Sequence, residues 1–136
     1  MNPKNFLQLQ GNVSTELTVR KSKDNKHANV SFSVAVEDSF ATKQPDGTKK
    51  KGVQYIRCNQ FLPNVDKENK HNLAYLMTLG KGDRVAILGQ LETSTYKDDK
   101  GETKYASQVS VETLSATEVA EVRAKRAERR KQQANA

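Results

Sequence analysis

Alternating apolar and polar positions are the clearest pattern along this chain, and they predict several β-strands. From Leu7 to Val19 every second position is apolar or small, and the positions between them are mostly polar. A period of two is typical of a strand with one buried face. Gly11 offers no side chain to pack, which indicates a bend or bulge in a sharply coiled sheet. We therefore expect one long first strand over residues 7–19.

Two further strands precede the middle of the chain. Alternation resumes over residues 29–36 and again over about 53–62, where Pro63 ends the third strand. Between these strands the sequence reads Pro45, Asp46, Gly47, a turn signal in which proline presets its own φ and glycine accepts a positive φ. Residues 42–52 are thus expected to form the tip of a long hairpin.

The second half of the chain adds one helix and two strands. Apolar side chains recur at helical spacing over residues 70–79, and Gly80 follows as a candidate C-terminal cap. Alternation marks a fourth strand over 85–96 and a fifth over 105–111, joined by a hairpin at 98–101. Three strands, one short helix and two strands predict an all-β fold, the five-stranded Greek-key barrel known as the OB-fold.

The character of the sequence changes after Leu114. Ser115 and Glu118 have the spacing of a capping box, so a helix can begin there. Only Val119 and Val122 supply an apolar stripe, which is little for docking. The expected organisation is an OB-fold domain over residues 1–114 and a basic C-terminal tail over residues 115–136 that is a frayed helix or disordered.

Composition and charge narrow the classes of function. The 136 residues carry a formal charge of +7, and residues 118–136 hold 6 basic against 3 acidic side chains. A basic balance favours a polyanionic partner. One cysteine and two isolated histidines exclude a disulfide framework and a structural zinc site, and we expect no metal and no cofactor. Because no apolar run approaches the roughly 20 residues of a membrane span, and the start lacks the apolar block of a signal peptide, a cytoplasmic protein without a membrane partner is expected.

The third predicted strand carries the candidate binding face. Its outward side chains are Tyr55, Arg57, Asn59 and Phe61, and Ile56 and Cys58 point the other way. Barrels of this type bind oligonucleotides or oligosaccharides on their second and third strands. Two rings with a guanidinium between them suit bases that stack while phosphates meet positive charge. For either ring alone, packing under a loop or at a contact between subunits is the alternative.

These features resemble the bacterial single-stranded DNA-binding proteins over roughly residues 5–114. The resemblance is carried by Gly11 and Asn12, by NVSFSVAVEDSF (29–40) and VQYIRCNQF (53–61), and by residues 73–111 with their GKGD, GQL and DKGE segments. Four aromatic positions stack on bases in that family, and they fall on Phe40, Tyr55, Phe61 and Tyr96. All four are aromatic in a chain with only eight Phe and Tyr residues. Basic contacts of the family fall on Lys43, Arg57 and Lys81, and the hairpin that wraps along the DNA carries Lys49, Lys50 and Lys51.

The resemblance implies a sequence-tolerant protein that coats and protects single-stranded DNA in replication, recombination or repair and is not an enzyme. It also implies a homodimer or homotetramer that pairs barrels through their first strands. The family typically has tryptophan at three of the four stacking sites, and this chain has none. We therefore expect weaker stacking for each base and a larger share for phosphate contacts.

Two other departures concern the DNA path and the partners. Glu92 and Ser94 stand where the family often has arginines. Cellular members end in an acidic, hydrophobic tip that recruits replication and repair proteins, whereas this chain ends in basic residues, so recruitment by that route is not expected. The basic ending is consistent with a version from a phage, plasmid or other mobile element, acting on the nucleoid or in a phage-infected cell.

Three alternatives remain beside this interpretation. An OB-fold accessory factor of the primosomal or recombination-mediator type would bind DNA weakly, and the basic tail suits it equally well. An RNA-binding barrel of the cold-shock type is disfavoured by the long first strand and the helix. An enzyme finds little support, since Tyr75 stands where a phosphate loop ending at Lys81 needs glycine, and Asp98 and Asp99 fit a solvated turn.

Overall fold

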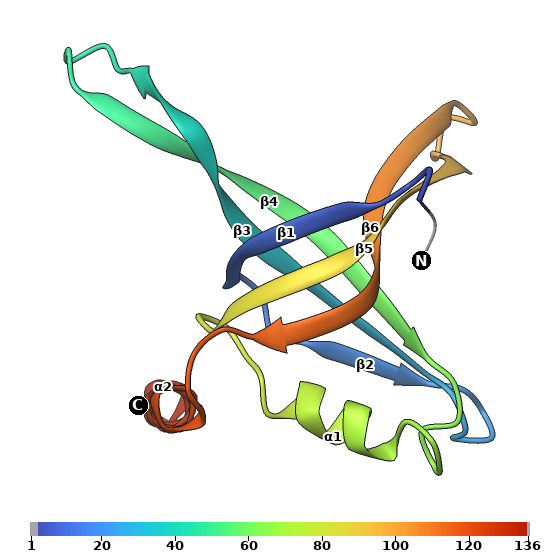
Figure 1. Ribbon diagram of the computed structural model, residues 1–136. Coiled ribbons are helices and arrows are strands. Elements are labelled where there is room, and N and C mark those ends of the chain that lie inside the picture. The colour runs from blue at the N-terminus through green and yellow to red at the C-terminus, as the bar shows by residue number, and fades with distance from the viewer. Residues whose placement is uncertain (1–2, 136) are drawn as a thin grey trace.

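The chain forms a small β-barrel, which a computed structural model describes for residues 3–135. Its strands follow one another around a curled sheet in the order β1 (Leu7–Val13), β5 (Arg84–Lys97), β6 (Thr103–Ala116), β4 (Lys49–Leu62), β3 (Ala28–Lys43) and β2 (Thr18–Lys21). Pairing of β1 with β3 closes five strands into the barrel, and β2 is an additional strand on β3 (Figure 1). The predicted OB-type barrel is confirmed.

The barrel interior is filled by the apolar side chains of the alternating strands. The fully buried side chains include Val30 and Val34 of β3 and Val85 and Ile87 of β5. They share the core with Val109 and Val111 of β6. Helix α1 (Lys70–Met77) lies across one end of the barrel and inserts Leu76 into the same core (Figure 1). Burial of these methyl groups is the main source of stability for so small a core.

The predicted first strand is two strands, and the prediction of one strand over residues 7–19 is wrong. β1 ends at Val13, where the chain leaves β5 and meets β3, and β2 begins at Thr18. The apolar alternation continues through the break because Leu17 and Val19 still pack against the core. Gly11 lies at the crossing, where an added Cβ would be 2.2 Å from the carbonyl oxygen of Ala35. The strands can cross this closely because residue 11 has no side chain.

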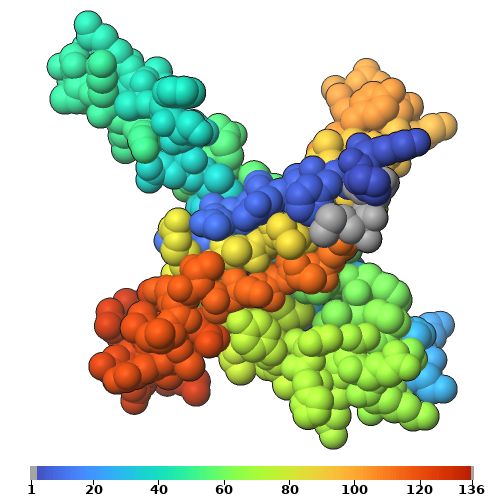
Figure 2. Space-filling view, viewed as in Figure 1, coloured from blue at the N-terminus to red at the C-terminus, as the bar shows by residue number. Residues whose placement is uncertain are grey.

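Two ribbons extend beyond the barrel as separate arms (Figures 1 and 2). One is the distal part of the β3–β4 hairpin, whose turn contains Gly47 at a φ of 89°. The other is the distal part of the β5–β6 hairpin, whose turn contains Gly101 at a φ of 79°. Both turns lie where the sequence predicts them, and both strand pairs are longer than predicted.

The end of α1 differs from the expectation. The helix ends at Met77, and Thr78 is its cap, with the hydroxyl of Thr78 donating to the carbonyl of Tyr75 at 2.6 Å. Gly80 is not a left-handed C-terminal cap, because it lacks the positive φ that such a cap has. It lies under the C-terminal helix instead, where an added Cβ would be 2.6 Å from Nη2 of Arg130.

Residues 120–134 form a second helix, α2 (Ala120–Ala134), where the sequence predicts a frayed helix or a disordered tail. The half-buried positions of this helix recur at helical spacing and are Arg123, Arg126, Ala127 and Arg130. The helix therefore docks through an arginine stripe rather than an apolar one. β6 itself runs to Ala116, and the division of the chain into two domains stays a prediction. Neither described helix is long and apolar enough to cross a membrane.

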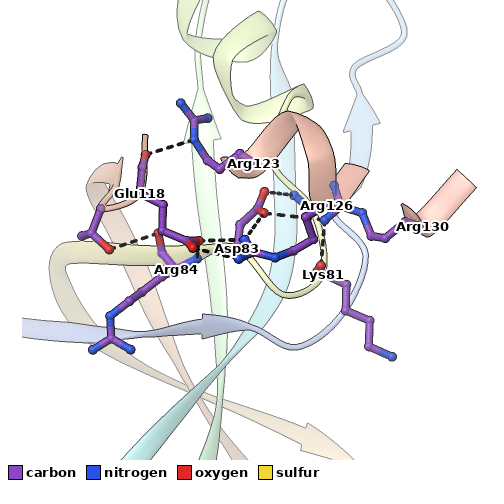
Figure 3. A network of polar contacts seen from close by, with 9 residues as sticks. Lys81, Asp83, Arg84, Glu118, Arg123, Arg126 and Arg130 are labelled. Carbon is purple, nitrogen blue, oxygen red and sulfur yellow. Dashed lines mark hydrogen bonds and ion pairs between the residues drawn. The ribbon is translucent and has the colours of Figure 1, made fainter. Parts of the chain in front are cut away.

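Two arginines of the stripe, Arg126 and Arg130, contact the loop between α1 and β5 (Figure 3). The side chain of Asp83 is fully buried, and one carboxylate oxygen accepts from Nη1 of Arg126 at 2.8 Å while the other accepts from the backbone N–H of Gly80 at 3.0 Å. Arg126 also binds both carboxylate oxygens of Glu118, at 2.7 and 2.8 Å. Arg130 donates to the carbonyl of Lys81 at 2.7 Å. A buried carboxylate needs such partners, because burial of an unpaired charge is costly.

Acid should weaken the docking of α2 through Glu118. The hydrogen bonds from Arg126, and after them the backbone N–H of Arg84, lower the pKa of Glu118 from 4.5 to about 2. A carboxyl with a depressed folded pKa stabilises the fold above pH 4.5 and loses that contribution as the pH falls toward 2. We expect the Glu118→Gln variant to show a shallower fall of unfolding free energy between about pH 5 and pH 2 than the wild type, measured by urea unfolding. Glu128→Gln, an exposed change on the same helix, should keep the wild-type response; an unchanged response in Glu118→Gln would contradict the assignment.

Candidate nucleic-acid interface

The outward face of β4 has the alternation that the sequence predicts. Tyr55, Arg57 and Phe61 are exposed to different degrees, whereas Cys58 is buried and Ile56 is partly buried on the opposite side. Burial raises the pKa of the Cys58 thiol to about 12, so it stays protonated near neutral pH and is a poor nucleophile. Both rings of β4 are thus available to a ligand, and the cysteine is not.

The neighbouring strand leaves these rings uncovered. In the antiparallel register of β3 and β4, Ala35 lies opposite Tyr55, Ser33 opposite Arg57, and Asn29 opposite Phe61. Residues directly opposite share one face of the sheet, and these three have short side chains. The result is a low surface on which two aromatic rings project on either side of a guanidinium.

Arg20 also belongs to this face, although its sequence context places it at the start of a polar connector. β2 pairs with β3 so that Arg20 lies opposite Asn29, and Asn29 lies opposite Phe61. The three residues form one row across the sheet and line a shallow pocket with His27, whose ring lies 5.9 Å from that of Phe61. The sequence signal that identifies Arg20 is its place in the alternation. It directly follows Val19, whose side chain points inward, so the side chain of Arg20 points outward.

Phe40 and the predicted lysines lie along the first arm. Phe40 is 85% exposed and sits at an irregularity in the β3–β4 ladder between Glu37 and Ala41. Lys43 lies directly opposite Lys49, and Lys51 forms an ion pair with Glu37 at 3.3 Å. Two like charges directly across a strand pair repel each other, and an anion between them relieves that repulsion. The arm therefore has the charge arrangement of a phosphate contact.

Tyr96 lies on the second arm. Its ring is 55% exposed, and its cross-strand neighbour is Lys104, whose amine forms ion pairs with Asp98 at 4.0 Å and Glu102 at 3.6 Å. Glu92 lies on the same side of β5 as Tyr96, two positions before Ser94. This stretch is less favourable to a phosphate than the β4 face, because its lysine already has carboxylate partners.

Lys81 is separated from the other candidates. It lies in the loop before β5, whereas Tyr96 lies near the far end of that strand. Its carbonyl holds Arg130 of α2, and its side chain points away from the network into solvent (Figure 3). The structure brings Arg57 and Phe61 onto one face with Tyr55 and places Phe40 on the adjoining arm, but Lys81 lies beside α2.

Within residues 3–135 there is no group of three or more His, Cys, Asp or Glu side chains that could hold a metal ion. Asp98 instead closes its own turn, with one carboxylate oxygen accepting from the backbone N–H groups of Lys100 and Glu102. What the described residues provide is rings, cations and small polar side chains on an exposed sheet.

Comparison with known proteins agrees with this geometry. The profile of the single-strand binding protein family matches residues 4–117. Among solved structures, the chain is similar to a deletion mutant of the single-stranded DNA binding protein from Thermus aquaticus, with 22% identity and a TM-score of 0.63 over 85% of this chain and 51% of that one. It is also similar to the Plasmodium falciparum SSB in its complex with ssDNA, with 20% identity and a TM-score of 0.65 over 87% of this chain and 100% of that one.

The chain spans about half the length of the Thermus aquaticus protein that it matches. A search of the curated proteins found no match. The family match, in contrast, covers most of the chain, including both arms and the β4 face.

Proposed function

Because the chain belongs to the single-strand binding protein family, we propose that it binds single-stranded DNA with little sequence preference and catalyses no reaction. The observation that carries the proposal is the β4 face, where Tyr55 and Phe61 are 72% and 56% exposed on either side of Arg57. Exposed apolar groups that share one face with a cation are typical of a surface that a ligand covers. Every base has a π-face, so stacking on such rings tolerates any sequence.

The proposed mechanism divides the work between rings and cations. Successive bases stack on Phe40, Tyr55, Phe61 and Tyr96, and phosphates meet the basic side chains of the face and first arm, namely Arg20, Lys43, Lys49, Lys50, Lys51 and Arg57. Neutralised phosphates release counterions, which gives binding its dependence on salt. We assign Lys81 a peripheral phosphate contact, because it lies beside α2 rather than on the β4 face.

The wider role follows the family. We propose that the chain acts as a homodimer or homotetramer in the cytoplasm and protects single strands exposed in replication, recombination or repair. Support for self-association comes from β1, whose outward side chains Gln8, Gln10 and Asn12 are exposed and polar. A sheet surface of this kind can form hydrogen bonds with a second copy.

The first test compares an oligothymidine strand with duplex DNA of equal length at two salt concentrations. We expect clear preference for the single strand, and we expect Tyr55→Ala to weaken its binding by about 1–3 kcal/mol through loss of one stacking platform. Thr48→Ala, at the tip of the first arm, is a control that leaves all four rings in place. Equal, weak binding of both DNA forms, seen only at low salt, would instead favour an accessory factor whose main partner is a protein.

A further inference from the structure

The second arm presents two faces to solvent. β1 pairs with β5 only as far as Gly89, and β4 pairs with β6 only at Val109 and Ser110. Beyond these positions the β5–β6 ribbon, residues 92–97 and 103–108, stands clear of the barrel (Figure 1). A strand of DNA that follows one face can therefore cross the free edge of the ribbon and reach the other.

An exposed tyrosine occupies the face opposite Tyr96. Tyr105 lies directly across from Thr95, so its ring points to the other side of the ribbon from the ring of Tyr96. It is 78% exposed, more than Tyr55, Phe61 or Tyr96. Its neighbours on that face are Thr93, Thr95, Thr103 and Ser107, whose short side chains leave the ring open and can donate hydrogen bonds.

Charge also favours this second face. On the face of Tyr96, Lys104 is tied to Asp98 and Glu102, and Glu92 adds a negative charge. On the face of Tyr105, Lys97 lies diagonally across from the ring, and none of residues 93, 95, 97, 103, 105 and 107 is acidic. A base over the ring would place its phosphate within reach of this lysine.

We propose that Tyr105, Lys97 and Thr95 form a second subsite for single-stranded DNA on the far face of the β5–β6 ribbon. Tyr105 stacks on a base, Lys97 meets a phosphate, and the Thr95 hydroxyl donates a hydrogen bond to the backbone of the DNA. The subsite continues the path from Tyr96 around the edge of the ribbon. The inference rests on the proposed function and extends it from four stacking platforms to five.

The lack of tryptophan in the sequence provides a direct test, because Tyr105→Trp introduces the only indole of the chain. We expect a saturating oligothymidine strand to quench its fluorescence through stacking. Tyr96→Trp is the matched positive control, and Met77→Trp, an exposed position at the end of α1, is the negative control. We also expect Tyr105→Ala to weaken binding of a long oligothymidine by roughly 5- to 150-fold, and Tyr105→Phe to preserve it.

The controls separate this inference from the function on which it rests. Quenching of the indole at positions 96 and 105 alike, with the indole at position 77 unaffected, supports the subsite. No quenching at position 105 by a strand that the protein binds overturns the subsite and leaves the proposed function intact, whereas failure of the wild-type protein to bind the strand overturns both. If emission from position 105 is blue-shifted before DNA is added, and Tyr105→Ala lowers the sedimentation coefficient, a second copy of the chain covers this face and the proposal is wrong.

Discussion

Arg126→Ala should lower the free energy of unfolding by about 3 kcal/mol, because it leaves the fully buried Asp83 carboxylate without its closest cation. Breaking a buried ion pair by removing one partner typically costs about 3–5 kcal/mol. The lower end applies here, since Arg126 is 28% exposed and Arg130 stays 3.6 Å from the same carboxylate oxygen. Urea unfolding at one fixed protein concentration measures the loss, and fixing the concentration removes any contribution from self-association.

Two variants decide whether the loss comes from Asp83. Arg129→Ala removes an exposed arginine from the same helix and should change stability by less than about 0.5 kcal/mol. Adding Asp83→Asn to Arg126→Ala should recover part of the loss, because a neutral amide needs no counter-charge and its oxygen can still accept from the N–H of Gly80. An Arg126→Ala protein as stable as the wild type would show that α2 is not held by this contact.

The docking of α2 explains why the tail cannot be recognised as a packed helix from its sequence. Apolar residues at helical spacing are the usual sign of a helix that packs, and Val119 and Val122 alone do not make one. Residues 123, 126 and 130 have the right spacing but are arginines, which in isolation indicate a solvated face. Asp83, the partner of Arg126 and Arg130, lies 43 residues before Arg126 and is recognisable only once the loop before β5 is folded. Long-range ion pairing of this kind leaves no periodic apolar signal.

The barrel and the β4 face, in contrast, follow from local pattern. The outward Tyr55, Arg57 and Phe61 are predicted by parity alone, because one buried face fixes the direction of every side chain in a strand. The break between β1 and β2 has no such signal, since the alternation runs through it and only the partner strand changes from β5 to β3. The place of Arg20 beside Phe61 is hidden by the same break, because it depends on the register of β2.

Removing two rings and removing three lysines should weaken DNA binding in different ways. The double variant Tyr55→Ala/Phe61→Ala should reduce affinity for oligothymidine by roughly 30- to 20,000-fold, if each ring contributes about 1–3 kcal/mol and the two act independently. The slope of log K against log salt should stay the same, because no phosphate contact is lost. The triple variant Lys49→Ala/Lys50→Ala/Lys51→Ala should instead reduce that slope by up to about 2, because each phosphate contact on a single strand contributes about 0.7 to it.

We expect the triple lysine variant to lower the slope by less than about 2, because Lys51 already forms an ion pair with Glu37. Lys51 gives up that partner when it contacts a phosphate. Lys67→Ala/Lys70→Ala changes one exposed lysine in the turn before α1 and one at its first position, and it should leave both affinity and slope near the wild-type values. Equilibrium titrations at several salt concentrations separate the two signatures, and urea unfolding confirms that each variant is folded. A double ring variant that loses less than about fivefold in affinity, or that lowers the slope as the lysine variant does, would mean that the β4 rings are not stacking platforms and that binding is electrostatic.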